Sequence, residues 1–181
     1  AASPEHCRQL RTAQPILREF KNITFGRRDG YDALLTWDGS PVPKVEVVDG
    51  KRVESYPNAR RPEWPEAEFI VGNPPFIGNK RMLEFLGVDY SAALRATYQS
   101  VPESVDLVMY WWDRAAGIVS QKNSSARRFG FVTTNSLTQT FNRRVLSEYV
   151  EKRQSIHLAM AIANHPWTKG DRSSAAVRIA M

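Results

Sequence analysis

The sequence predicts an α/β fold in which a mostly parallel sheet carries helices on its faces. From residue 67 onward, short apolar runs rich in β-branched and aromatic residues alternate with longer segments of helical spacing. Their order is strand, helices, strand, helix, strand, loop and strand, which is typical of parallel sheets with crossover helices. The apolar and charged fractions of 42% and 24% are those of a globular chain with a core.

Two units are expected, residues 1–66 and residues 67–181. Residues 1–30 are polar and basic with weak helical spacing, and the rest of the first unit is rich in Pro, Gly and charge. Within it, Lys44–Tyr56 predicts a β-hairpin, because Asp49-Gly50 supplies a two-residue turn between alternating valines. We expect this first unit to be an arm or insertion outside the core.

The second unit is expected to contain the α/β elements. Ser104 and Asn142 can cap two of its helices, since side-chain oxygens accept hydrogen bonds from the first N–H groups of a helix. The first strand is expected to be buried, because it is apolar throughout and ends at a double proline. The expected strands are 69–71, 129–134, 155–162 and 175–181, and the expected helices are 89–99, one following Pro102 as far as Val119, and 142–150.

Composition excludes several classes of protein. The formal charge of +6 suits a polyanionic partner, although many globular proteins are mildly basic. The single cysteine, Cys7, allows no internal disulfide, and the histidines lack metal-ligand spacing, so no structural zinc is expected. Without an apolar run of membrane-spanning length or a signal pattern, a cytoplasmic location is expected. A chain that opens without Met and stops within an expected strand suggests a fragment of a larger polypeptide.

The motif Asn73-Pro74-Pro75-Phe76 directly follows the first expected strand, at the sheet edge where α/β proteins bind ligands. An exocyclic amine on a base is a poor nucleophile, because its lone pair is delocalised into the ring. The Asn73 side-chain oxygen and the Pro74 carbonyl can accept its two N–H groups and free that lone pair. The prolines hold these acceptors rigid. Phe76 can stack on an extruded base. The alternative is a Pro-rich turn with Phe76 in the core.

At these residues the chain resembles the amino-methyltransferases with an Asn-Pro-Pro-Tyr/Phe motif. Residues 67–181, about two thirds of the chain, further resemble the type IIG restriction-modification methyltransferases. The resemblance implies a partial Rossmann-like sheet of the class I methyltransferases. It also implies methyl transfer from S-adenosylmethionine to the N6 amino group of adenine in DNA. The phrases that carry it, in order, are 69–78, 106–112, 130–136 and 175–179.

The resemblance assigns roles to single residues. It implies that Asn73 and Pro74, with Pro75, hold the amino group and that Phe76 stacks on the ring. Trp167, or else His165, would cover the second face of the base. For the cofactor it implies Asn73, Asp106 and Tyr110, although Asp106 can equally be a first-turn helix charge.

The chain departs from the family in lacking the Gly-rich cofactor loop, since it contains no Gly-x-Gly pattern. We therefore expect the isolated fragment to be inactive and to bind the cofactor weakly or not at all. Its partners would be DNA and the remaining part of a parent chain. No nuclease motif is recognisable.

Basic pairs follow two of the expected strand ends. Lys80, Arg81, Arg143 and Arg144 are candidates for contacts with the DNA backbone, and the alternative is an ordinary solvated surface. Two other functions use related features. The same motif serves guanine-N2 methylation of RNA and glutamine-N5 methylation of proteins, and a catalytically silent DNA-recognition module would share the basic surface.

Overall fold

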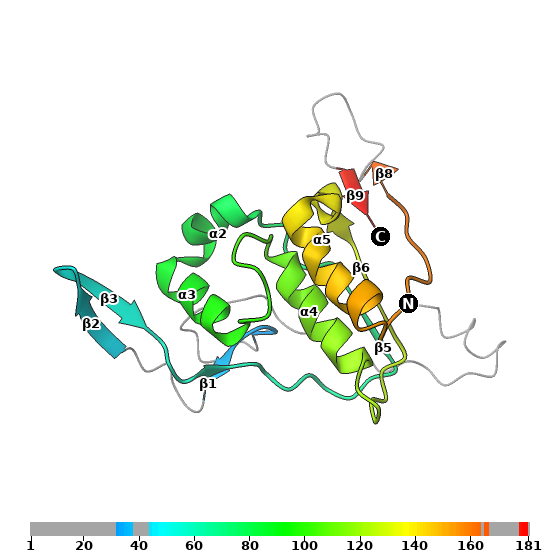
Figure 1. Cartoon of the computed structure of the whole chain (residues 1–181), viewed down its shortest axis with the longest axis horizontal. Helices are drawn as coiled ribbons and strands as arrows, with labels where there is room; N and C mark the ends of the chain where they lie inside the picture. The colour runs from blue at the N-terminus through cyan, green and yellow to red at the C-terminus, as the bar shows by residue number, and fades with distance from the viewer. Residues whose placement is uncertain (1–31, 38–43, 164, 167–177, 181) are drawn as a thin grey trace, which may run out of the picture.

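The structure is a computed structural model that describes residues 32–37, 44–163, 165–166 and 178–180 (Figure 1). It confirms a mixed α/β fold. The strands are β1 Thr36–Trp37, β2 Lys44–Val48, β3 Lys51–Ser55, β4 Ala59–Arg60, β5 Phe69–Gly72, β6 Arg128–Phe131, β7 Thr133–Thr134, β8 His165–Pro166 and β9 Arg178–Ala180. The helices are α2 Asn79–Leu86, α3 Val88–Thr97, α4 Val108–Val119 and α5 Thr140–Ser147, with the 3-10 turn η1 Asn135–Thr138 and the π-helical turn η2 Glu148–Lys152.

Parallel pairing is less extensive than the sequence predicts. β5 and β6 run parallel, with Phe69 opposite Arg128 and Gly72 opposite Phe131. The β7-β9-β8 sheet is antiparallel, as are the β1–β4 and β2–β3 pairs. The expectation of a mostly parallel sheet is therefore wrong for the described strands. The prediction is correct for β5 and β6, the parallel pair among the described strands, which ends at the motif.

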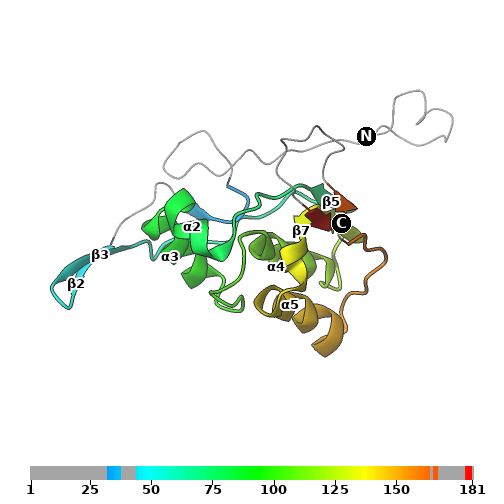
Figure 2. The same ribbon diagram turned by 90° about the horizontal axis from the view of Figure 1, so that it is seen from above.

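Helices cover one face of the β5–β6 pair. The Trp112 ring of α4 meets the Phe129 ring of β6 edge-on, with centroids 4.6 Å apart. Figures 1 and 2 show α4 and α5 on the same side of these strands. On the opposite side, Phe69 and Val71 are 56% and 76% exposed. β5 therefore forms where the sequence predicts it, but the expectation that it is buried is wrong.

The core includes residues from the expected arm. Leu34 and Leu35 are fully buried with α3 and α4 residues such as Leu94 and Met109. The buried Tyr98 hydroxyl donates a 3.0 Å hydrogen bond to the Leu34 carbonyl oxygen. The expectation that the segment before residue 67 stands outside the core is thus wrong for these leucines, because their apolar side chains complete the core beneath α3.

The predicted hairpin is confirmed. β2 and β3 pair in antiparallel register around Asp49 and Gly50, whose φ angles of 52° and 74° suit the tight turn that matches strand twist. Figure 1 shows the hairpin projecting away from the helices. Val47 of β2 is 73% exposed, so this part of the first unit does stand apart from the core.

Several predicted boundaries are wrong. Helix α4 begins at Val108, and neither Ser104 nor Asn142 caps a helix, since α4 follows Leu107 and α5 follows Gln139. No strand forms over 155–162, although β9 confirms part of the last expected strand. Helix α2 was not predicted. Among the helices that the structure describes, none has the length and apolar character needed to span a membrane.

Candidate active site

The Asn-Pro-Pro-Phe motif lies directly beyond the carboxyl end of β5. Asn73 is exposed, Pro74 is buried, Pro75 is half-buried and Phe76 is 37% exposed. Phe76 is therefore not one of the buried core residues, as the alternative of a structural turn had placed it. Within the described part of the chain, no hydrogen bond engages the Asn73 side chain or the Pro74 carbonyl.

The ends of the two parallel strands are fixed beside each other. The backbone N–H of Val132 donates a 3.0 Å hydrogen bond to the Gly72 carbonyl oxygen, immediately before Asn73. Past the motif, Ile77 N–H donates to the Pro75 carbonyl at 3.1 Å, and the Ile77 carbonyl accepts from Leu107 N–H at 2.9 Å. The motif is therefore held at both ends by backbone contacts.

Asp106 links three elements at this edge. Its Oδ1 accepts a 3.0 Å hydrogen bond from the backbone N–H of Asn79, the first residue of α2. Its Oδ2 accepts from the Ser136 hydroxyl at 2.6 Å and from Asn142 Nδ2 at 2.9 Å. Asn142 Oδ1 in turn accepts from the Asp106 backbone N–H at 2.9 Å. These contacts bring the start of α2, the η1 turn and α5 together.

Asn142 turns inward instead of capping a helix. Its side chain is buried, and besides Asp106 it donates a 2.9 Å hydrogen bond to the Ser136 carbonyl. Ser136 and Asn142 are thus site residues that the sequence analysis did not assign. The polar run Thr133 to Ser136 at a strand end was the one sequence signal that pointed toward them.

The residues predicted to bind the cofactor do not form a site together. Both carboxylate oxygens of Asp106 accept hydrogen bonds from the protein. Tyr110 is fully buried, with its ring edge-on to Tyr98 at 5.5 Å, and burial raises the pKa of its hydroxyl. Of the three predicted residues, Asn73 is exposed, Asp106 is half-buried and Tyr110 is buried. Their part in binding S-adenosylmethionine stays a prediction, and among the described residues no group of His, Cys, Asp and Glu is arranged to hold a metal ion.

The four predicted DNA-contacting cations are exposed on α2 and α5. The start of α2 and the first turn of α5 are linked through Asp106, which bonds both Asn79 and Asn142. The Arg81 guanidinium lies 4.3 Å from the centroid of the exposed Phe85 ring, and that of Arg144 lies 5.1 Å from the centroid of Phe141. The structure thus places basic and aromatic side chains together on two helices that begin near the motif.

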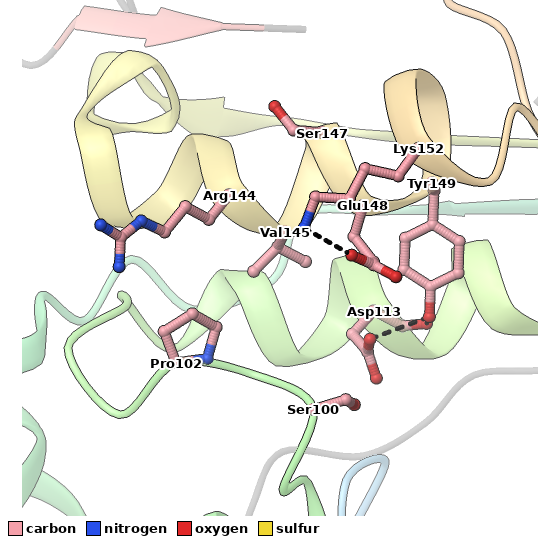
Figure 3. Close-up of a pocket in the computed structure, with 9 residues that line it drawn as sticks. All are labelled: Ser100, Pro102, Asp113, Arg144, Val145, Ser147, Glu148, Tyr149 and Lys152. Atoms are coloured by element: carbon pink, nitrogen blue, oxygen red, sulfur yellow. Dashed lines mark hydrogen bonds and ion pairs between the residues drawn. The ribbon is translucent and has the colours of Figure 1, made fainter.

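A pocket of about 280 Å³ lies away from the motif, between α4, α5 and η2 (Figure 3). Arg144 is the only predicted site residue that lines it. On its walls the Tyr149 hydroxyl donates a 2.8 Å hydrogen bond to Asp113, and Lys152 pairs with Glu148 at 3.1 Å. Its lining residues are Ser100, Pro102, Asp113, Arg144, Val145, Ser147, Glu148, Tyr149 and Lys152.

The second base-stacking residue stays a prediction. Trp167 lies outside the described residues. His165, the alternative, is exposed in β8 and pairs with Ile179 of β9. Because β9 also pairs with β7, the chain that carries His165 is connected through the sheet to the strand end next to the motif.

The α/β fold with the motif at the end of a parallel strand agrees with a methyltransferase domain, and the family comparison assigns the chain to that class. Residues 35–181 match the family model described as the DNA-methyltransferase domain of MmeI, and the chain belongs to this family. The comparisons with curated proteins and with solved structures found no match. The family match begins before residue 67, as does the buried core.

Proposed function

We propose that the chain acts in the transfer of a methyl group from S-adenosylmethionine to the N6 amino group of adenine in DNA, within a restriction-modification system. One observation carries the proposal. Asn73 is exposed and Phe76 is 37% exposed on either side of the Pro-Pro pair, at the end of a parallel strand. The family supports DNA as the substrate.

The chain's part in the reaction is to hold the target base. The Asn73 side-chain oxygen and the Pro74 carbonyl accept the two N–H groups of the exocyclic amine. This pyramidalises the nitrogen and turns its lone pair toward the incoming methyl group. S-adenosylmethionine supplies an electrophilic methyl group when bound. The amine becomes acidic only after it is methylated, so water can take its proton and no strong base is required.

Phe76 and the basic side chains account for the choice of substrate. A base that leaves the duplex loses stacking, and an aromatic face restores about 1–3 kcal/mol of it. Lys80, Arg81, Arg143 and Arg144 are exposed near the motif and can contact phosphates. We further propose that the chain works in the cytoplasm with the remaining part of a parent methyltransferase.

The test is Asn73→Ala in the full-length protein, with methyl transfer measured from labelled S-adenosylmethionine to unmethylated genomic DNA. The rate is expected to fall about 100-fold or more, the scale for loss of one preorganised hydrogen-bonding group. Asn123→Ala, which changes an exposed asparagine remote from the motif in sequence, is the control and should keep the wild-type rate.

The products separate the competing functions. N6-methyladenine in the digested DNA supports the proposal. Label that appears only in RNA or protein would instead assign guanine-N2 or glutamine-N5 methylation. DNA binding without methyl transfer, unchanged by the Asn73 substitution, would indicate a recognition module.

A further inference from the structure

Asp106 does for α2 what a local cap ordinarily does. Gly78, the residue before α2, has no side chain to cap it, and the first turn of α2 contains no acidic residue. The N–H of Asn79 instead points at the Asp106 carboxylate, 27 positions along the chain. A negative charge at this place also interacts favourably with the helix dipole. The start of α2 is therefore fixed by a side chain from the loop before α4.

The same carboxylate contacts the turn that follows β7. The Ser136 hydroxyl donates to Asp106 and lies 2.6 Å from the Thr134 hydroxyl, so the chain leaving β7 is tied to the chain leaving β5. Asn142 closes the arrangement by bonding both the backbone and the side chain of Asp106. All of these groups are at least partly buried, which strengthens each contact and makes an unmatched donor costly.

The charge and shape of a carboxylate are both required here. Its two oxygens accept from one backbone N–H, one hydroxyl and one amide, three donors that converge from three elements. An asparagine at this position would offer a single acceptor oxygen. Its amide group would face either the Asn79 N–H or the Asn142 amide, so in each orientation two donors would oppose each other. The three donors around position 106 can therefore all be satisfied by Asp but not by Asn.

We propose that Asp106 is a positioning residue for methyl transfer, through its hold on the chain that follows Phe76 and on the Thr134–Ser136 turn. Ile77 is joined to Leu107, and Asn79 is joined to Asp106. The backbone that follows Phe76 is consequently held in place by hydrogen bonds to Asp106 and Leu107. This inference rests on the proposed function, because it assigns a purpose to the rigidity of the Asn73–Phe76 site.

The experiment compares Asp106→Asn with Asp113→Asn in the full-length protein. Asp113 is the matched control, because it is also a carboxylate within the helical layer and accepts a 2.8 Å hydrogen bond from Tyr149, while its ion pair is with Arg61, outside the motif. Asp106→Asn is expected to lower kcat for DNA methylation about 10-fold to 100-fold, as a misplacement near 1 Å can do. Asp113→Asn should lower the thermal midpoint without lowering kcat of the folded enzyme.

A split between kcat and KM distinguishes positioning from general damage. In Asp106→Asn, kcat of the folded enzyme should fall while KM for DNA stays close to that of the wild type, because the residues that contact the DNA are unchanged. Equal kcat for Asp106→Asn and wild type would overturn the inference, as would a change confined to KM. If Asn73→Ala also leaves methylation unchanged, the proposed function itself has failed. If Asn73→Ala abolishes it while Asp106→Asn does not, only the positioning role is lost.

Discussion

The Tyr149 hydroxyl donates a 2.8 Å hydrogen bond to Oδ1 of Asp113, and both side chains are buried between α4 and η2 (Figure 3). The second carboxylate oxygen of Asp113 lies 3.4 Å from the Arg61 guanidinium, which comes from the segment before β5. Arg61 also lies over the Tyr98 ring, 4.2 Å from its centroid. A single buried carboxylate thus connects α4 with η2 and with the segment that precedes β5.

Alkaline pH is expected to destabilise the fold partly through Tyr149. Burial, and then the negative charge of Asp113, raise the pKa of Tyr149 above its ordinary value near 10. As the pH rises above about 10, the unfolded chain loses this proton while the native state keeps it. The free energy of unfolding should therefore fall, by up to about 1.4 kcal/mol per pH unit for each such tyrosine.

Tyr149→Phe should make that fall shallower, at a cost of about 1–2 kcal/mol at neutral pH from the lost hydrogen bond. Urea unfolding at about pH 9, 10 and 11 measures both effects. The pKa of Tyr98 is raised as well, so Tyr98→Phe should flatten the curve in the same direction. An unchanged slope in both variants would contradict this account.

Leu34→Ala tests whether the chain before residue 67 belongs to the core. Leu34 has no exposed surface, so its truncation should lower the free energy of unfolding by about 2–5 kcal/mol through lost burial and the cavity left behind. Val47→Ala in the exposed hairpin should change it by no more than about 0.5 kcal/mol. Similar effects of the two substitutions would restore a boundary near residue 66.

Phe76→Ala should lower kcat/KM for DNA methylation about 5-fold to 150-fold, equivalent to roughly 1–3 kcal/mol of base stacking. Phe76→Trp keeps an aromatic face and should retain most of the activity. The control is Phe85→Ala on α2, an aromatic ring that is 53% exposed and lies outside the motif. A loss as large in the control as in Phe76→Ala would remove the stacking role.

Basic residues that contact phosphates should determine how DNA binding responds to salt. Arg81→Gln and Arg143→Gln are each expected to reduce the slope of log K against log salt by about 0.9, because each contact releases counterions. Lys122→Gln, an exposed residue remote from α2 and α5 in sequence, should leave the slope as it is. Titrations of labelled duplex DNA at several salt concentrations give this slope directly, and unaltered slopes in both arginine variants would indicate a solvated surface.

Local pattern predicted two helices that bury an apolar face and the hairpin that its turn residues define. Helices α3 and α4 and the hairpin appear close to where spacing and turn residues place them. Helix α2 was missed because it buries a single side chain, Met82, and so presents no apolar stripe. Over 155–162 the alternation of Leu158 and Met160 suggested a strand, but both are exposed and no strand forms there. An alternating apolar pattern shows which side chains a strand would bury. It does not show whether a neighbouring strand is present to pair with it.

The candidate site was also predicted only where it depends on local sequence. The motif was visible because its four residues are consecutive and follow an apolar run. The links from Asp106 to Asn79, Ser136 and Asn142 join residues roughly 27 to 36 positions apart. Asn142 shows the difficulty most clearly, since a capping residue and an inward hydrogen-bonding residue have the same side chain and differ only in tertiary context.

The parallel register of β5 and β6 has a consequence for how the protein folds. Residues 73–127, which include three helices, lie between the two strands in the sequence. Pairing of β5 with β6 is therefore a non-local contact, and we expect it to form late and slowly. If β5 slipped by one residue against β6, Phe69 and Ile70 would exchange faces of the sheet. Asn73 would then move away from its place beside the end of β6. Errors in folding would therefore accumulate as compact molecules with intact helices and a misaligned catalytic edge.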